Sequence, residues 1–171
     1  EKLKAKLKVN EIDLDIRVVE NLQSYRTQKV RILNGAHTAL VPLSLLHGHE
    51  IVSDIFTSSF TKSFLEESVR NEIAPTLEMD KHSLNQFTES VFDRFKNPFI
   101  KHYLASIALN SISKFKVRVL PSLLAFQNKN GTLPPHLVFS FACLLQFYQG
   151  NWKGKTLPVQ DDEKIVKELN N

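Results

Sequence analysis

Several hydrogen-bonding side chains lie within a short apolar stretch, residues 29–40, "KVRILNGAHTAL". On a helix that turns about 100° per residue, Lys29, Asn34 and His37 share one broad face. Lys29 and His37 are separated by about 12 Å of helical rise, which an extended six-carbon molecule could bridge with help from the side chains. The spacing therefore fits an elongated polar ligand. A structural interpretation stays open, in which Lys29 snorkels, Asn34 bonds back to the helix and His37 is a satisfied core histidine.

Two other patterns look like metal or redox sites, and we interpret both as structural. His47-Gly48-His49 resembles a metal-binding pair, but no nearby acidic or Cys residue completes a ligand set. We therefore predict a helix end there and no metal. The one cysteine, Cys143, lies in an apolar segment, so a disulfide framework or a Cys-based metal site is excluded.

The composition indicates one soluble globular domain. The chain has 171 residues, of which 42% are hydrophobic and 23% charged, enough for a sizeable core. No apolar run approaches the roughly 20 residues of a membrane helix, and no signal peptide is recognisable. The chain begins at Glu1 and not at Met, so we expect a piece of a longer cytoplasmic protein.

The net charge of +4 raises the question of nucleic-acid binding. The basic residues near the start alternate with apolar ones and are followed by acidic ones. No recognition helix, RNA-binding signature or zinc finger accompanies them, so we expect no nucleic-acid partner.

The apolar periodicity predicts a mainly helical, all-α fold. Alternation at Ile12, Leu14, Ile16 and Val18 predicts one short strand. From Tyr25 onward the period is that of helices, and four or five packed helices are expected. We therefore divide the chain into a connector with the strand, residues 1–24, and a helical domain, residues 25–171.

The expected helices are bounded by recognisable breaks. These are predicted at residues 47–50, 97–98, 128–135 and 149–158. Kinks or helix ends are predicted at three prolines within helical patterns, Pro42, Pro75 and Pro121. Residues 138–148 are apolar on nearly every side, which predicts the most buried helix, at the centre of the bundle.

Long segments of the chain resemble a known family. In "KVRILNGAHTALVP" an Asn stands five positions after a Lys, and a His three positions after that Asn. This pattern is similar to the signature of the polyol-specific long-chain dehydrogenases, the mannitol dehydrogenase family. Residues 25–42, 95–150 and 158–162 resemble the same family in the same order. Within it, the likeness is to members that act on altronate and tagaturonate.

The resemblance implies the helical C-terminal domain of an NAD-dependent, metal-independent oxidoreductase that interconverts D-altronate and D-tagaturonate. In such enzymes an N-terminal Rossmann domain is the partner, and the small sugar-acid substrate lies between the two domains. This sequence has no G-x-G-x-x-G after a strand, so the cofactor-binding half is absent. We therefore expect the chain alone to be inactive.

The resemblance also assigns roles to the opening residues. Lys29 would be the general acid/base that exchanges the proton of the reacting hydroxyl. A free lysine titrates near about 10.4, so such a base needs burial or cationic neighbours, and Arg31 lies two residues away. Asn34 would donate its amide to the developing alkoxide, and His37 would bind a neighbouring hydroxyl.

A sugar acid also carries a carboxylate, for which an Arg fork is the best match. The candidates are Arg31 and Arg118, and we favour Arg118, with Lys114 one turn earlier in support. An ordinary surface pair is the alternative. Asn110 and His102 are weaker candidates, and we interpret both as structural.

Two alternatives stay open. The substrate could instead be the mannonate and fructuronate pair, or mannitol, because one sequence does not reveal which stereocentre is read. The chain could also be a helical interaction domain that keeps the helix without the chemistry. A Rossmann fingerprint upstream would support the enzyme, and its absence the interaction domain.

Overall fold

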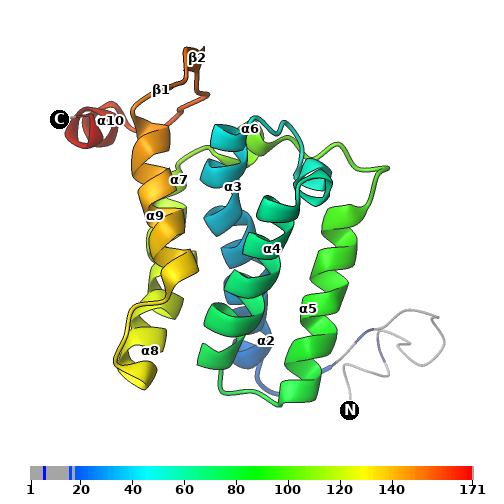
Figure 1. The fold of residues 1–171 in the computed structure, drawn as a ribbon. Coiled ribbons are helices and arrows are strands. Elements are labelled where there is room, and N and C mark those ends of the chain that lie inside the picture. Colours follow the sequence, from blue (N-terminus) through cyan, green and yellow to red (C-terminus); the bar gives the residue numbers. More distant parts are fainter. Residues whose placement is uncertain (1–5, 7–15, 17, 171) are drawn as a thin grey trace.

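The computed structural model describes residue 6, residue 16 and residues 18–170, and shows a helical domain with one small sheet (Figure 1). The helical segments are α2 (Gln23–Gln28), η2 (Lys29–Asn34), α3 (Gly35–His47), η3 (Val52–Thr57), α4 (Ser59–Glu67), η4 (Ser68–Ile73), η5 (Ala74–Thr76), α5 (Lys81–Lys96), α6 (Leu104–Ile107), α7 (Ser111–Arg118), α8 (Leu120–Asn130), α9 (Pro135–Tyr148) and α10 (Glu163–Leu169). Segments η2 and η4 are π-helical, and η3 and η5 are 3₁₀ turns. The predicted all-α class is confirmed.

The sheet lies in a stretch that was predicted as a break. Strands β1 (Asn151–Trp152) and β2 (Lys155–Thr156) form an antiparallel hairpin directly after α9. The strand predicted near the N-terminus falls mostly outside the described residues. Of its four apolar positions only Ile16 and Val18 are described, and neither is in a strand.

The predicted helix boundaries agree with the structure at most breaks. Helix α3 ends at His47, where Gly48 adopts φ 98°, and α5 ends at Lys96, just before the predicted break at residues 97–98. Pro75 and Pro121 lie in the first turns of η5 and α8, as expected for helix ends. Helix α3, in contrast, continues through Pro42.

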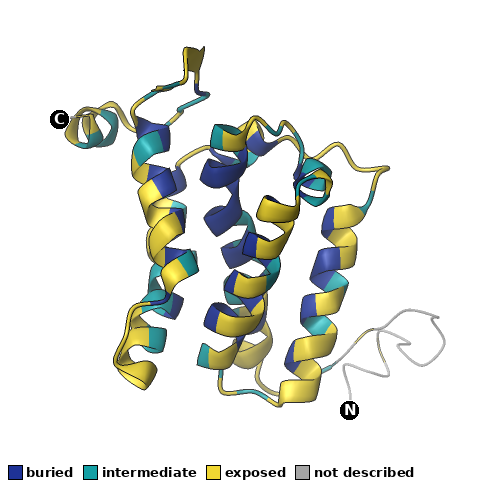
Figure 2. Cartoon of the chain, viewed as in Figure 1, coloured by how far each residue is buried: buried dark blue, intermediate teal, exposed yellow. Residues whose placement is uncertain are grey.

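Helix α3 is the most buried helix, and the prediction that residues 138–148 would be is wrong. Most of α3 is buried from Gly35 to Ser44, and Figure 2 shows it as the mainly dark-blue helix between α9 and α4. Its small residues Gly35, Ala36 and Ala39 let neighbours pack closely around it.

Helix α9 buries only one side against α3, through residues that include Leu137, Cys143, Leu144 and Phe147. Its outer side exposes four apolar side chains, those of Val138, Phe139, Phe141 and Leu145. The apolar sequence of α9 therefore did not predict how deeply the helix is buried. No described residue fully covers the apolar side chains on its outer side.

A buried carboxylate joins η4 to the beginning of α9. Glu72 accepts hydrogen bonds from the backbone N–H groups of His136 and Leu137, each at 2.8 Å, and its carboxylate lies 2.6 Å from His136 Nδ1. The first N–H groups of a helix have no partner inside the helix. Glu72 thus satisfies the N-terminus of α9 and fixes that helix to η4.

Candidate active site

A π-helical turn carries the residues singled out in the sequence. Segment η2 begins at Lys29, ends at Asn34 and joins α2 to α3 without a break. In a π-helix the hydrogen bonds run from residue i to i+5, so successive side chains are rotated away from their α-helical positions. Short π-helical turns are frequent at functional sites. At the end of the turn, the Thr38 hydroxyl donates to the Asn34 carbonyl at 2.8 Å.

The structure places the three signature residues in different surroundings. Lys29 is exposed, Asn34 lines one hollow, and His37 lines another. Lys29 lines neither of these two hollows, and Asn34 and His37 line different ones. The burial expected for a lysine base is also not supplied by the described part of the chain.

The hollow beside Asn34 has a volume of about 570 Å³ and is strongly basic. We call it the arginine hollow. It is lined by residues of α2, η2, the end of α7 and the start of α8: Gln23, Arg26, Thr27, Val30, Arg31, Asn34, Val117, Arg118 and Pro121. Among the described residues, none that lines it is acidic. Its size is within the range of whole small-molecule sites, about 300 to 1,000 Å³.

Two of its arginines, Arg31 and Arg118, line the hollow together with Asn34. Arg31 Nη1 is buried and has no hydrogen-bond partner among the described residues. Burial lowers the pKa of Arg31 from its ordinary value. Arg118 Nη1 donates to the Thr38 hydroxyl at 3.5 Å. A buried, unpaired guanidinium N–H is costly, so this hollow favours an anionic ligand.

Gly35 allows the end of α7 to pack closely against the start of α3. A Cβ atom at position 35 would lie 3.2 Å from the backbone carbonyl oxygen of Arg118. Such a contact is tighter than van der Waals packing prefers, so the approach depends on the absence of a side chain.

Lys114 lies near Arg118 but not in the arginine hollow. Its Nζ donates to the Ile107 carbonyl at 2.8 Å. Burial, and then the positive charge of Arg118, lower the pKa of Lys114. Asn110, one of the two weaker candidates, adopts φ 52° at the start of α7, and its N–H donates to the Gln160 carbonyl at 2.9 Å.

A second hollow, of about 190 Å³, contains His37. We call it the histidine hollow. It is lined by residues of η2, α3, η3, α5 and the following loop: Leu33, His37, Val52, Arg94, Phe95, Ile100 and His102. The His37 ring is stacked on Phe95 with centroids 4.1 Å apart, and meets His102 edge-on with centroids 5.1 Å apart.

His37 is a neutral imidazole with an unused nitrogen. Burial, and then the charges of His102 and Arg118, lower the pKa of His37 from 6.5 to about 3. Its Nε2 atom is buried and has no hydrogen-bond partner among the described residues. A neutral imidazole has one donor and one acceptor nitrogen, so the side chain is suited to bind a hydroxyl group.

Both hollows contain residues that the sequence did not predict as site residues. His102 was interpreted as structural, yet it lies beside His37, and Arg94 was not singled out at all. Arg26 was noted only as part of the basic charge. The position of His102 depends on a long-range contact, in which Val52 N–H donates to the His102 carbonyl at 3.0 Å. A single sequence carries no local signal for such a pairing.

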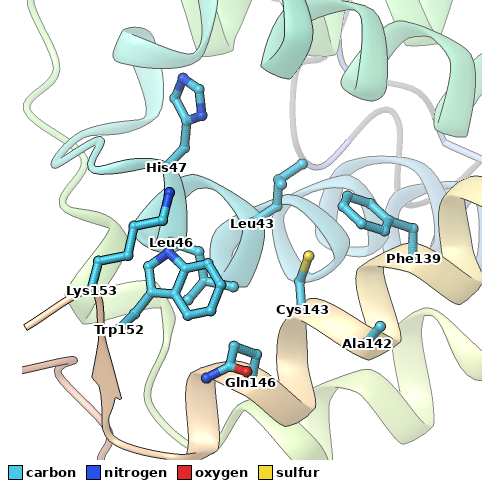
Figure 3. A pocket seen from close by; sticks show the side chains of 9 residues that line it. All are labelled: Leu43, Leu46, His47, Phe139, Ala142, Cys143, Gln146, Trp152 and Lys153. Atoms are coloured by element: carbon cyan, nitrogen blue, oxygen red, sulfur yellow. The ribbon is translucent and has the colours of Figure 1, made fainter.

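A third hollow, of about 350 Å³, lies between α3, α9 and the hairpin, and its lining is mostly apolar (Figure 3). Trp152 of the hairpin lies beside Gln146 of α9, Lys153 extends towards His47, and the Cys143 thiol points towards Leu43. Burial raises the pKa of Cys143 to about 11, so the thiol stays protonated and unreactive. We therefore do not place the chemistry here.

The described residues include neither a metal-binding cluster nor a membrane-spanning helix. Within the described part of the chain, no group of three His, Cys, Asp or Glu side chains is arranged to hold a metal ion. Nor does any described helix have the length and apolar character needed to cross a membrane.

The chain matches a known protein family. Residues 21–170 match the mannitol dehydrogenase C-terminal domain. The chain belongs to this family. The family resemblance seen in the sequence is thereby confirmed.

Several relatives of this mannitol dehydrogenase C-terminal domain are altronate oxidoreductases. Those of Yersinia pestis and of Klebsiella pneumoniae strain 342 are each 44% identical over 160 residues. Each match covers 94% of this chain and 33% of the relative. The chain thus spans about a third of the length of these relatives.

Solved structures with the same fold include Pseudomonas fluorescens mannitol 2-dehydrogenase, in a ternary complex with NAD and D-mannitol, and a substrate-free D-sorbitol dehydrogenase. Both superpose with a TM-score of 0.81, at 20% and 22% identity respectively. Each match covers 90% of this chain and 32% of the other. At these identities the likeness establishes the fold of the domain.

Proposed function

We propose that the chain is the C-terminal catalytic and substrate-binding domain of an NAD-dependent oxidoreductase that interconverts D-altronate and D-tagaturonate. Residues 25–171 form this domain, and residues 1–24 connect it to a cofactor-binding Rossmann domain. The identity to altronate oxidoreductases supports the choice of substrate. The proposal includes a cytoplasmic location.

The basic lining of the arginine hollow supports this function. Asn34, predicted to bind the reacting oxygen, lines the same hollow as Arg31 and Arg118, and among the described residues no acidic side chain lines it. A neutral polyol needs hydrogen-bonding groups but no cations, whereas a sugar acid brings a carboxylate that an Arg fork binds well. The arginine hollow thus supports a sugar acid over mannitol.

Each candidate side chain has a separate role in this reaction. The Asn34 amide donates to the oxygen of the reacting alcohol and stabilises the charge that develops there. Lys29 takes the hydroxyl proton in oxidation and returns it in reduction. Arg118 binds the carboxylate, supported by Arg31 in the same hollow and by the nearby Lys114. His37 binds a hydroxyl that does not react.

The exposure of Lys29 fits an enzyme whose site is completed from outside the described residues. A lysine that acts as a base needs surroundings drier than an exposed surface. A cofactor-binding domain packed against this one would provide them. NAD, when bound, accepts the hydride from the carbinol carbon. The chain's own residues hold the alcohol and move its proton.

The test uses the complete enzyme, meaning this domain together with its cofactor-binding domain. With NAD, we expect oxidation of altronate to exceed that of mannonate and of mannitol in kcat/KM, and the 171-residue chain alone to be inactive. Preference for mannonate or mannitol would assign the corresponding related activity. No oxidation of any of the three would favour a helical interaction domain, for which the exposed apolar side of α9 offers a surface.

A further inference from the structure

We propose that the histidine hollow binds the terminal hydroxymethyl group of the sugar acid, and that His102 and Arg94 make the enzyme selective for that group. The inference rests on the proposed function. It adds two specificity-determining residues that lie on other elements than the signature helix.

The hollow is built to bind a polar group. The His37 Nε2 atom is buried there without a hydrogen-bond partner among the described residues. A buried polar atom left without a partner destabilises the fold, and in native proteins it calls for an explanation. A ligand hydroxyl in the hollow supplies that partner.

The volume indicates that only one end of a ligand enters. At about 190 Å³ the histidine hollow is smaller than the roughly 300 to 1,000 Å³ of whole-ligand sites. The arginine hollow, at about 570 Å³, can hold the carboxylate and most of the carbon chain. Arg118 of the arginine hollow lies close enough to His37 for its charge to lower the pKa of that histidine, so one sugar acid can extend from the first hollow into the second.

The chemistry of His37 identifies which end enters. Its pKa is lowered to about 3, so the ring is neutral at ordinary pH and offers one donor and one acceptor. At Nε2 a hydroxyl can either donate or accept, whichever the tautomer requires, whereas a neutral ring brings no positive charge to balance a carboxylate. The charged end of the substrate therefore belongs in the arginine hollow, and the neutral hydroxymethyl end belongs with His37.

His102 and Arg94 supply the other polar groups of this hollow from two different elements. The loop that carries His102 is fixed to the segment after α3, because Val52 N–H donates to the His102 carbonyl at 3.0 Å and Leu104 N–H donates to the Glu50 carbonyl at 2.9 Å. Arg94 precedes Phe95, the residue stacked on His37, and forms no ion pair with any described residue. Both side chains are thus positioned to bind the terminal hydroxyl.

The experiment compares altronate with 6-deoxyaltronate, which keeps the carboxylate and every secondary alcohol and lacks only the terminal hydroxyl. It is done with the complete enzyme, with His102→Phe, which keeps an aromatic ring beside His37, and with Arg94→Met. Lys101→Met is the matched control, since Lys101 is exposed, adjoins His102 and does not line the hollow.

We expect the unmodified enzyme to prefer altronate by about tenfold or more in kcat/KM, since a site that binds a hydroxyl rejects the analogue lacking it. His102→Phe and Arg94→Met should each lower kcat/KM for altronate and leave that for 6-deoxyaltronate nearly unchanged, so the preference shrinks. Lys101→Met should keep the full preference.

The outcomes separate this inference from the proposed function. If the unmodified enzyme does not oxidise altronate, the proposed function fails and the inference falls with it. If it oxidises both acids equally well, or if the variants lose activity on both equally, only the inference is overturned. Arg94 is exposed, so Arg94→Met should fold and decides the question even if His102→Phe does not.

Discussion

The imidazole of His37 is stacked on the phenyl ring of Phe95, with centroids 4.1 Å apart and ring planes at 17° to each other. The contact joins α3 to α5 and takes the imidazole out of water. With His102 edge-on to the same ring, His37 is held in one orientation. In the sequence, His37 could be either a substrate-binding residue or a satisfied core histidine. The structure shows that packing fixes its ring, while Nε2 has no hydrogen-bond partner among the described residues.

The low pKa of His37 predicts a pH dependence of stability. The pKa of His37 is lowered from 6.5 to about 3. Between pH 6.5 and about pH 3, His37 is therefore protonated in the unfolded chain and neutral in the folded chain. The free energy of unfolding should therefore fall as the pH drops from about 6.5 towards about 3. His37→Leu removes this contribution, so its stability should fall less steeply over that window.

The measurement is a series of chemical denaturation curves at successive pH values for both proteins. Other groups titrate in the same range, so the difference between the two curves is the informative quantity. Parallel curves would mean that His37 is protonated as easily in the folded chain as in the unfolded chain.

Glu72 should be important for stability, because its buried carboxylate satisfies the first N–H groups of α9. Its side chain is only 3% exposed. Glu72→Ala leaves buried donors without a partner, so we expect a loss of about 2 to 4 kcal/mol in the free energy of unfolding. Urea denaturation measures this directly.

Glu67 is the natural control for that experiment. It also contacts His136, with 3.2 Å between Glu67 Oε2 and His136 Nε2, but its side chain is 47% exposed. Exposed ion pairs contribute little, so Glu67→Ala should cost less than about 1 kcal/mol. Equal losses for the two variants would contradict the capping role of Glu72.

Much of the fold was predictable from the sequence because its signals are local. The helical period after Tyr25, Gly48 at the end of α3 and Asn97-Pro98 after α5 each act within a few residues, and the structure agrees with them. The family resemblance identified Lys29, Asn34 and His37 as candidate site residues. Their spacing in the sequence was enough for this, without knowledge of the residues packed around them.

The remaining features depend on packing. Nothing local in residues 29–34 distinguishes a π-helical turn from an α-helix. Helix α9 is apolar all round, yet which side is buried depends on where α3 lies. His102 reaches His37 only through the pairing of its loop with Val52, distant in the sequence.

Arg118 and Lys114 should differ in their effects on substrate binding. Arg118 lines the arginine hollow, whereas the Lys114 ammonium already donates to the Ile107 carbonyl. In the complete enzyme, Arg118→Met should raise KM for altronate by roughly tenfold to a hundredfold, as expected for a lost charge-assisted hydrogen bond. Lys114→Met should raise it less. The reverse order would make Lys114 the main carboxylate ligand.

Asn34 should act mainly on turnover. If its amide stabilises the developing alkoxide, Asn34→Ala should cost about 3 kcal/mol in transition-state stabilisation, seen in kcat and kcat/KM with little change in KM. Steady-state kinetics with altronate measure this. A large rise in KM with unchanged kcat would instead show that Asn34 binds substrate and transition state equally.

The last prediction concerns Lys29 as the proton-transfer group. Lys29→Met keeps much of the apolar bulk and the helix propensity, and the side chain is exposed in the described chain, so folding should survive. Without the base, the chemical step in the complete enzyme should slow by about a hundredfold to ten-thousandfold, and substrate binding should change less. The comparison is turnover of altronate, reduction of tagaturonate and the melting temperature, in the unmodified enzyme and in Lys29→Met. Both directions should slow together, because the same group takes the proton in one and returns it in the other. Near-normal turnover, or a loss that only follows a lower melting temperature, would leave Lys29 as a snorkelling helix residue and the proposed mechanism without its base.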